Sequence, residues 1–207
     1  MDDLQLNPGY EQIIDALMAD KYAIADSFFS SSEIDALQVS LRSKYKSDGF
    51  KKSAIGNLAN EKVVDAVRGD YILWLDEESA DEAEKQFFSK INDFVQYLNR
   101  TCYLGITDKE FHYAVYPEGT FYKRHLDSFQ NDSRRKLSMV CYLNDEDWQP
   151  EFGGELTIYL KENGRETEKN IYPLKGRMVI FESQLLEHEV KPVKQQRLSI
   201  TGWLKSR

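Results

Sequence analysis

The spacing of apolar side chains divides the chain into a first half typical of helices and a second half typical of strands. In the first half, three stretches carry apolar residues at the three- and four-residue spacing of a buried helix face. These stretches are residues 8–18, 30–41 and 79–105. Ser30 with Glu33, and again Ser79 with Glu82, fit the capping-box pattern, which predicts where the second and third helices begin.

Short stretches with the pattern of strands follow one another at regular spacing after residue 107. Turn signals such as Pro117-Glu118-Gly119 and Asn163-Gly164 separate them. The predicted strands are residues 109–116, 120–127, 136–143, 154–160, 168–173, 176–182, 188–191 and 197–204, after two earlier ones at 21–28 and 71–75. Such a succession predicts a closed sandwich or jelly roll, so we expect an α+β fold with the N-terminal helices packed on one sheet.

The length and composition are those of one folded domain over residues 1–207. A chain of this size buries roughly 70% of its surface on folding, and 41% hydrophobic with 30% charged residues excludes general disorder. Residues 1–107 form the helix-rich supporting part and residues 108–207 the β core. Within the first part, the Gly- and Asn-containing residues 48–60 predict an exposed, mobile loop.

The charge distribution argues against several classes of partner. The net charge is −8, and the excess lies in residues 1–100, where 11 basic residues stand against 19 acidic ones. Nucleic-acid binding requires clustered basic residues, so we expect no nucleic-acid partner. We also expect no membrane partner and no signal peptide, because no apolar stretch is long enough. Cys102 and Cys141, far apart in the sequence, are typical of a reducing cytoplasm, where we expect the protein to act.

Candidate metal ligands come from the strand-rich half. In His125-Leu126-Asp127, the imidazole and the carboxylate are two residues apart and therefore point to the same face of a strand. His188 follows on a later predicted strand. Two histidines and one carboxylate leave metal positions open, which suits Fe(II) that must bind a cosubstrate and O₂, whereas structural zinc needs four protein ligands. His112 is expected to be an ordinary core or rim histidine whose ring is hydrogen-bonded.

The last predicted strand carries a candidate anion-binding residue. Strand alternation places Arg197, Ser199, Thr201 and Trp203 on one face and the apolar residues between them on the other. An arginine pointing into a small barrel must meet an anion, because an unpaired buried charge is costly. That anion is either an internal Asp or Glu or the carboxylate of a ligand.

The chain resembles the Fe(II)- and 2-oxoglutarate-dependent dioxygenases, in particular the prolyl 4-hydroxylases of the hypoxia-sensing (EGL-nine-like) type and their bacterial relatives. His125-x-Asp127, the distant His188 and Arg197-x-Ser199 match the family motif in order and spacing. The further matching stretches are Arg68-Gly69-Asp70-x-Ile72-x-Trp74, Tyr116-Pro117, Tyr122-x-Arg124-His125-x-Asp127, Tyr142-Leu143-Asn144-x-x-x-Trp148, Gly153-Gly154, His188-Glu189-Val190 and Arg197 through Trp203.

This resemblance implies a double-stranded β-helix and a set of site residues. It implies iron held by His125, Asp127 and His188, which are also the catalytic residues, and 2-oxoglutarate held by Arg197 and Tyr142. The residues implied to line the cosubstrate site are Tyr116, Val140, Thr201 and Trp203. The residues implied for substrate binding are Tyr122, Arg68, Asp70, Arg134 and Trp203, with Asp70 and Arg134 forming a pair. Residues 48–70 match the loop that closes over a peptide, O₂ is the second cosubstrate, and ascorbate is a candidate reductant.

The resemblance also implies a function: hydroxylation of a prolyl residue in a cytoplasmic protein, with release of succinate and CO₂. Among bacterial relatives it points to elongation factor Tu as partner. Basic residues near the site, namely Lys123, Arg124, Arg134 and Arg135, suggest acidic neighbours of the target proline. The alternatives are oxidation of a free amino acid or small metabolite, a ligand-binding barrel without catalysis, and nucleic-acid demethylation, which the net charge disfavours.

Overall fold

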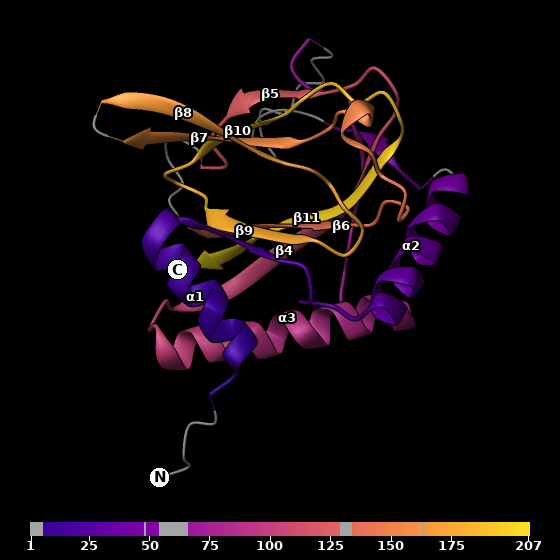
Figure 1. Ribbon diagram of the computed structural model, residues 1–207. Coiled ribbons are helices and arrows are strands. Elements are labelled where there is room, and N and C mark those ends of the chain that lie inside the picture. Colours follow the sequence, from indigo (N-terminus) through magenta and orange to yellow (C-terminus); the bar gives the residue numbers. More distant parts are fainter. Residues whose placement is uncertain (1–5, 48, 54–65, 129–133, 163) are drawn as a thin grey trace.

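The computed structural model describes residues 6–47, 49–53, 66–128, 134–162 and 164–207. Two antiparallel sheets lie face to face, and helices cover the outer face of the larger one (Figure 1). The helices are α1 (Pro8–Asp20), α2 (Ser31–Lys46) and α3 (Glu82–Thr101), with a short 3-10 turn at Pro150–Phe152. None of the described helices combines the length and the apolar character needed to cross a bilayer.

The larger sheet joins strands from both halves of the chain. Its order is β1-β9-β6-β11-β4-β3-β2. The strands are β1 (Tyr22–Ala25), β2 (Lys51–Lys52), β3 (Tyr71–Trp74), β4 (Ile106–Tyr116), β6 (Arg135–Tyr142), β9 (Met178–Glu182) and β11 (Arg197–Ser206). The central strand β11 pairs with β4 on one side and β6 on the other, so its side chains reach the middle of the fold.

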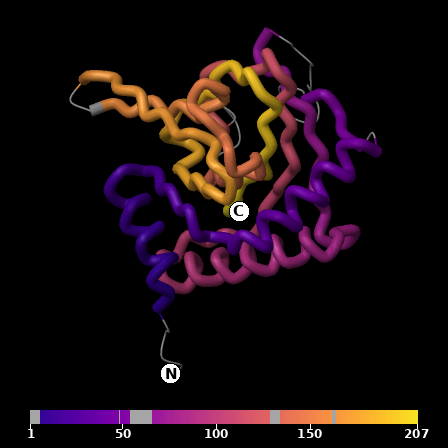
Figure 2. Tube along the Cα trace, turned by 45° about the vertical axis from the view of Figure 1, so that its right-hand side comes forward, coloured from indigo at the N-terminus to yellow at the C-terminus, as the bar shows by residue number. Residues whose placement is uncertain are grey.

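The smaller sheet has the order β5-β10-β7-β8 and lies above the larger one. Its strands are β5 (Tyr122–His125), β7 (Leu156–Glu162), β8 (Arg165–Ile171) and β10 (Glu187–Val190). The β7–β8 hairpin projects beyond the body of the molecule (Figure 2). Along β8 every residue is exposed except Ile171, so this edge contributes little to the core.

Local hydrogen bonds explain where the helices begin. The side chain of Asn7 accepts hydrogen bonds from the backbone at the start of α1, and Ser30 with Glu33 forms the predicted capping box of α2. The predicted start of α3 is wrong: its capping box is formed by Asp81 and Glu84, two residues after Ser79 and Glu82. Asp serves as N-cap as well as Ser, so two overlapping patterns compete in this stretch.

The main core lies between the helices and the larger sheet. Phe87 and Phe94 of α3 are at most 1% exposed, and the ring of Phe87 meets that of Phe111 on β4 at a centroid distance of 5.1 Å. Leu198 and Ile200 of β11 join the same cluster. Each such buried side chain contributes about 1.5–3 kcal/mol to stability. The helical layer therefore packs against one face of β11, and the opposite face of this strand carries the candidate site.

The sequence prediction of the fold class is confirmed. All eight strands expected after residue 107 are present, as are the strands at 22–25 and 71–74. The two-residue strand β2 lies in the segment expected to be a loop. Of the predicted mobile loop and substrate loop, residues 48 and 54–65 lie outside the described residues.

Candidate active site

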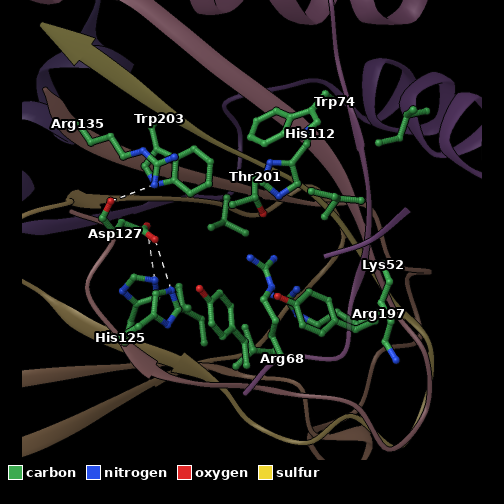
Figure 3. A pocket seen from close by; sticks show the side chains of 18 of the residues that line it. Lys52, Arg68, Trp74, His112, His125, Asp127, Arg135, Arg197, Thr201 and Trp203 are labelled. Atoms are coloured by element: carbon green, nitrogen blue, oxygen red, sulfur yellow. Dashed lines mark hydrogen bonds and ion pairs between the residues drawn. The ribbon is translucent and has the colours of Figure 1, made fainter. Parts of the chain in front are cut away.

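A cavity of about 390 Å³ opens between the two sheets. Figure 3 shows its walls, to which both sheets contribute. Seven of the predicted site residues outside the metal triad line it: Arg68, Tyr116, Tyr122, Val140, Arg197, Thr201 and Trp203. The cavity reaches the surface beside Trp74, whose exposed fraction is 52%.

The structure brings the three predicted metal ligands together. His125 ends β5, Asp127 follows it in the chain, and His188 lies opposite His125 in the pairing of β10 with β5. Asp127 Oδ1 is 3.4 Å from His125 Nε2, and its Oδ2 is 3.6 Å from His188 Nε2. One ligand atom from each residue lies within 4.8 Å of the others, and Figure 3 shows His125 turned toward the carboxylate of Asp127. Asp127 lies just beyond the strand rather than on it, but the convergence is the predicted one.

The backbone orients both imidazoles. His125 Nδ1 is 2.8 Å from the carbonyl oxygen of Lys123, and His188 Nδ1 is 3.1 Å from that of Leu186. A ring nitrogen facing a carbonyl carries the proton, so each Nε2 presents a lone pair. Burial lowers the pKa of His188 to about 4, more than the nearby Asp127 raises it, so this imidazole is neutral at physiological pH.

The carboxylate of Asp127 is kept ionised and fixed in direction. Burial opposes its ionisation, but His188, His125 and a hydrogen bond together hold its pKa well below the usual range. That hydrogen bond comes from Ser138 on β6, whose hydroxyl donates to Asp127 Oδ2 at 2.7 Å. Ser138 Oγ is in turn 2.8 Å from Ser183 Oγ, and both serines are fully buried. Sequence reasoning missed this pair, because no spacing signal links residues that meet only through sheet pairing.

Replacing Ser138 with alanine is expected to weaken Fe(II) binding by about 10- to 100-fold, because the freed Asp127 oxygen loses its partner and its fixed direction. Anaerobic titration of the ligand-free protein with Fe(II) measures this change. Ser138→Thr keeps the hydroxyl and should restore binding, whereas Ser43→Ala, on the exposed face of α2, serves as the matched control. Equal Fe(II) affinities for Ser138→Ala and the unmodified protein would contradict the orienting role.

Arg197 is a buried cation without an ion-pair partner among the described side chains. It is 1% exposed, its guanidinium lies 4.9 Å from the ring centroids of Tyr116 and Tyr142, and no described carboxylate forms an ion pair with it. Its guanidinium donates a long hydrogen bond from Nη1 to Ser199 Oγ, at 3.4 Å. Arg197 Nε and the Tyr142 hydroxyl are both buried, and neither has a hydrogen-bond partner among the residues that the structure describes. Buried polar groups are normally paired, so this end of the cavity fits an anionic ligand.

Two neighbouring features shape this anion site. Burial raises the pKa of Tyr142, so its hydroxyl remains a hydrogen-bond donor. Gly154, with φ of +70°, lets the chain pass close to the arginine: a Cβ there would lie 2.7 Å from Val193 and 3.1 Å from Arg197 Cδ. The Gly153-Gly154 motif therefore has a steric reason in the structure.

The residues predicted for substrate binding are distributed differently from the expectation. Asp70 is fully buried and forms a bidentate ion pair with Arg68, at 2.8 Å and 2.6 Å, and Arg68 lies over the ring of Tyr122. Arg134 is exposed and does not line the cavity, whereas its neighbour Arg135 does. Asp70 therefore pairs with Arg68 and not with Arg134, its predicted partner.

The donor set fits a divalent iron and an anionic cosubstrate. Two neutral imidazoles and one carboxylate leave a divalent ion with net charge +1 and with open positions. Arg197 lines the same cavity, and its guanidinium together with the neighbouring Tyr142 hydroxyl offers a matching site for a second, remote carboxylate. A molecule that chelates the metal at one end and carries a carboxylate at the other satisfies both.

Comparison with known proteins agrees with this chemistry. Residues 111–205 match the model of the 2OG-Fe(II) oxygenase superfamily. A prolyl-4-hydroxylase structure from Pseudomonas putida is 34% identical with a TM-score of 0.85, covering 97% of this chain and 100% of that one.

Two further relatives are similar to the chain. A prolyl hydroxylase from Trichoplax adhaerens, solved in complex with a hypoxia inducible factor oxygen degradation domain peptide fragment, is 29% identical with a TM-score of 0.84, covering 95% of this chain and 89% of that one. The hypoxia-inducible factor prolyl hydroxylase of Caenorhabditis elegans is 26% identical over 202 residues, 93% of this chain. The chain spans 28% of the length of this curated relative.

Proposed function

Because the chain belongs to the 2OG-Fe(II) oxygenase superfamily, we propose that this Fe(II)- and 2-oxoglutarate-dependent dioxygenase hydroxylates a prolyl residue within a protein segment. The observation that carries the proposal is a cavity that contains the candidate metal ligands and the anion site and opens to the surface beside Trp74 and Leu126. Such an opening admits a loop of another protein. The similarity to prolyl hydroxylases over nearly the whole chain supports the same substrate class.

Bound Fe(II), with 2-oxoglutarate and O₂, supplies the oxidising power that converts a C–H bond of the substrate to an alcohol and releases succinate and CO₂. The residues of this chain bind and orient the reactants. His125, Asp127 and His188 hold the metal on one side and leave the other side for the reactants. Arg197 and Tyr142 hold the far carboxylate of 2-oxoglutarate and so determine its direction toward the metal.

The walls around these groups keep water away from the reaction. Tyr116 and Val140 are 5% exposed and Trp203 is 8% exposed, and all three line the cavity. Excluding water strengthens the hydrogen bonds that hold an anion in the site and protects a reactive oxidant from side reactions. On the substrate side, the rings of Tyr122 and Trp203 line the cavity and offer apolar contacts to a pyrrolidine ring.

The ion pairs of the basic residues near the site change the expectation that the target proline has acidic neighbours. Arg124 is paired with Glu166 and Glu187, and Arg135 donates to Glu110. Two of the four basic residues near the site are thus already paired within the chain. The preference for acidic residues in the substrate should accordingly be weak and sensitive to salt.

In this proposal the partner is a cytoplasmic protein with a proline in an exposed loop. Elongation factor Tu is the first candidate, on the ground of the resemblance to bacterial relatives. The free thiols of Cys102 and Cys141 support action in a reducing compartment.

The proposal predicts that the protein with Fe(II), 2-oxoglutarate and O₂ adds one oxygen atom to a proline in a folded protein or peptide. The experiment incubates it with purified elongation factor Tu, an array of prolyl peptides and free L-proline, and locates added oxygen by mass spectrometry. Coupled succinate formation is measured in parallel, with Asp127→Ala as the inactive control. Oxidation of free L-proline alone, or of non-prolyl side chains alone, would contradict the proposal.

A further inference from the structure

His112 differs from the hydrogen-bonded core histidine expected from the sequence. It lies on β4, opposite Thr201 of β11 and Trp74 of β3, and its ring lines the same cavity as the candidate metal ligands. It is 3% exposed, and its buried Nδ1 has no hydrogen-bond partner in the described part of the chain. His112 does not belong to the group of residues whose atoms could share a metal ion. Its place in the site therefore needs another explanation.

Two indole rings flank the imidazole. The ring of Trp74 meets that of His112 at a centroid distance of 4.9 Å, and the ring of Trp203 at 5.6 Å (Figure 3). Trp74 is half exposed at the mouth, whereas Trp203 is buried within the cavity. The three rings form an aromatic wall, defined here as Trp74, His112 and Trp203, that leads from the surface toward the metal ligands.

The aromatic wall contains two unused polar atoms. Besides His112 Nδ1, the buried indole Nε1 of Trp203 has no partner among the described residues. Burial and the nearby Arg68 cation together lower the pKa of His112 to about 3 against the opposing pull of Asp70. The imidazole is therefore neutral and has one donor and one acceptor nitrogen, while the indole is a donor only. Buried polar groups without partners are rare, which points to a ligand that supplies them.

The charged donors of the same region already have acceptors. Arg135 lies over the Trp203 ring at 3.6 Å, donates twice to Glu110 and donates from Nη1 to the backbone oxygen of Asp127. Arg68 donates through Nε and Nη2 to Asp70. Among the described residues of the aromatic wall, the buried polar atoms left without a partner are thus His112 Nδ1 and the indole N–H of Trp203.

We infer that His112 positions the substrate by donating a hydrogen bond from Nδ1 to a main-chain carbonyl oxygen that flanks the target proline. This inference rests on the proposed prolyl substrate. The peptide group before a proline has no N–H and can offer only its carbonyl, so a binding wall for prolyl segments needs donors. The indole faces give the pyrrolidine ring an apolar surface next to that donor.

The test is a coupling experiment between His112 and the substrate main chain. The probe is the shortest prolyl peptide that the protein hydroxylates in the array, together with two analogues in which an alkene replaces the peptide bond before or after the proline. Its dissociation constant is measured by fluorescence anisotropy of a labelled peptide, and kcat and KM by succinate release. His112→Leu should weaken peptide binding by about 5- to 150-fold and raise KM more than it lowers kcat.

The result that supports the inference is non-additive. The unmodified protein should bind one of the alkene analogues as weakly as the His112→Leu variant binds the natural peptide. The His112→Leu variant should bind that analogue and the natural peptide with equal affinity. His112→Asn places an amide N–H near the position of Nδ1 and should recover most of the affinity. The exposed Val39→Ala on α2 is the control for handling and folding.

Three outcomes would overturn the inference. Additive losses for both analogues would show that His112 does not meet a flanking carbonyl. Equal binding by His112→Leu and the unmodified protein would remove its role in the substrate site. A matching fall in 2-oxoglutarate affinity would assign it to the cosubstrate instead. If the unmodified protein hydroxylates no prolyl peptide at all, the proposed function fails, and this inference fails with it.

Discussion

Asp127→Ala is expected to lose Fe(II) binding by at least about 100-fold and to stop the conversion of 2-oxoglutarate to succinate. Partners that only orient a metal ligand already contribute about 10- to 100-fold to affinity, and a ligand itself contributes more. The carboxylate is also the one negative charge of the triad, so its loss leaves two neutral imidazoles to hold a divalent ion. Anaerobic Fe(II) titration and succinate analysis by NMR measure the two effects.

The loss should not come from unfolding. Asp127 belongs to none of the apolar clusters, so the core remains intact without it. Asp127→Asn keeps the shape and removes the charge, and should behave like the alanine variant in both measurements. Asp15→Ala, an exposed carboxylate on α1, is the matched control with unchanged Fe(II) binding. Succinate production at the unmodified rate by either Asp127 variant would refute the assignment of this ligand.

Arg197→Met is expected to weaken 2-oxoglutarate binding by about 10- to 150-fold, corresponding to a charge-assisted hydrogen bond of about 1.5–3 kcal/mol. The effect on folding separates the two interpretations of this buried arginine. Breaking a buried ion pair costs about 3–5 kcal/mol. Because Arg197 has no ion-pair partner among the described residues, its removal from the ligand-free protein should lower the free energy of unfolding by much less.

Arg197→Lys keeps a charge but not the planar pair of donors, so it should also bind 2-oxoglutarate poorly. Arg42→Met, which removes a surface arginine paired with Asp145, controls for loss of charge. Calorimetric titration gives the affinity, and urea unfolding of the ligand-free protein gives the stability. An unchanged affinity for 2-oxoglutarate, or a loss of stability as large as that of a broken ion pair, would return Arg197 to a structural role.

The fold was predictable where a single pattern of apolar and polar residues runs along a stretch of sequence. The alternation along residues 197–204 placed Arg197, Thr201 and Trp203 on the cavity face and Leu198 in the helical core, as the structure has them. The start of α3 was less predictable. Ser79 and Asp81 are both good N-caps with an acidic residue three positions later, and tertiary contacts select the second. One of these is the hydrogen bond from the Ser40 hydroxyl to Asp81.

The site was predictable from motif spacing but not from burial. His125, Asp127 and His188 have a recognisable order, whereas Ser138 and His112 matter through contacts that no local pattern encodes. Ser138, on β6 of the larger sheet, reaches Asp127, which follows β5 of the smaller sheet in the chain.

His112 is unusual because its buried Nδ1 lacks a hydrogen-bond partner among the described residues, and only the three-dimensional structure can reveal this. Arg134 and Arg135 are adjacent in the sequence, but of these two only Arg135 lines the cavity. A difference of one position along the chain therefore decides which side chain faces the site.

The projecting β7–β8 hairpin has a consequence for the behaviour of the protein at high concentration. Strand β8 ends its sheet, and the uncovered backbone of an edge strand is a template on which a second molecule can add a strand and begin an aggregate. Its exposed side chains include Arg165, Glu166, Glu168 and Lys169, which keep water at this edge. The edge therefore resists strand-to-strand association between molecules, and replacing these charges with apolar residues would remove that protection.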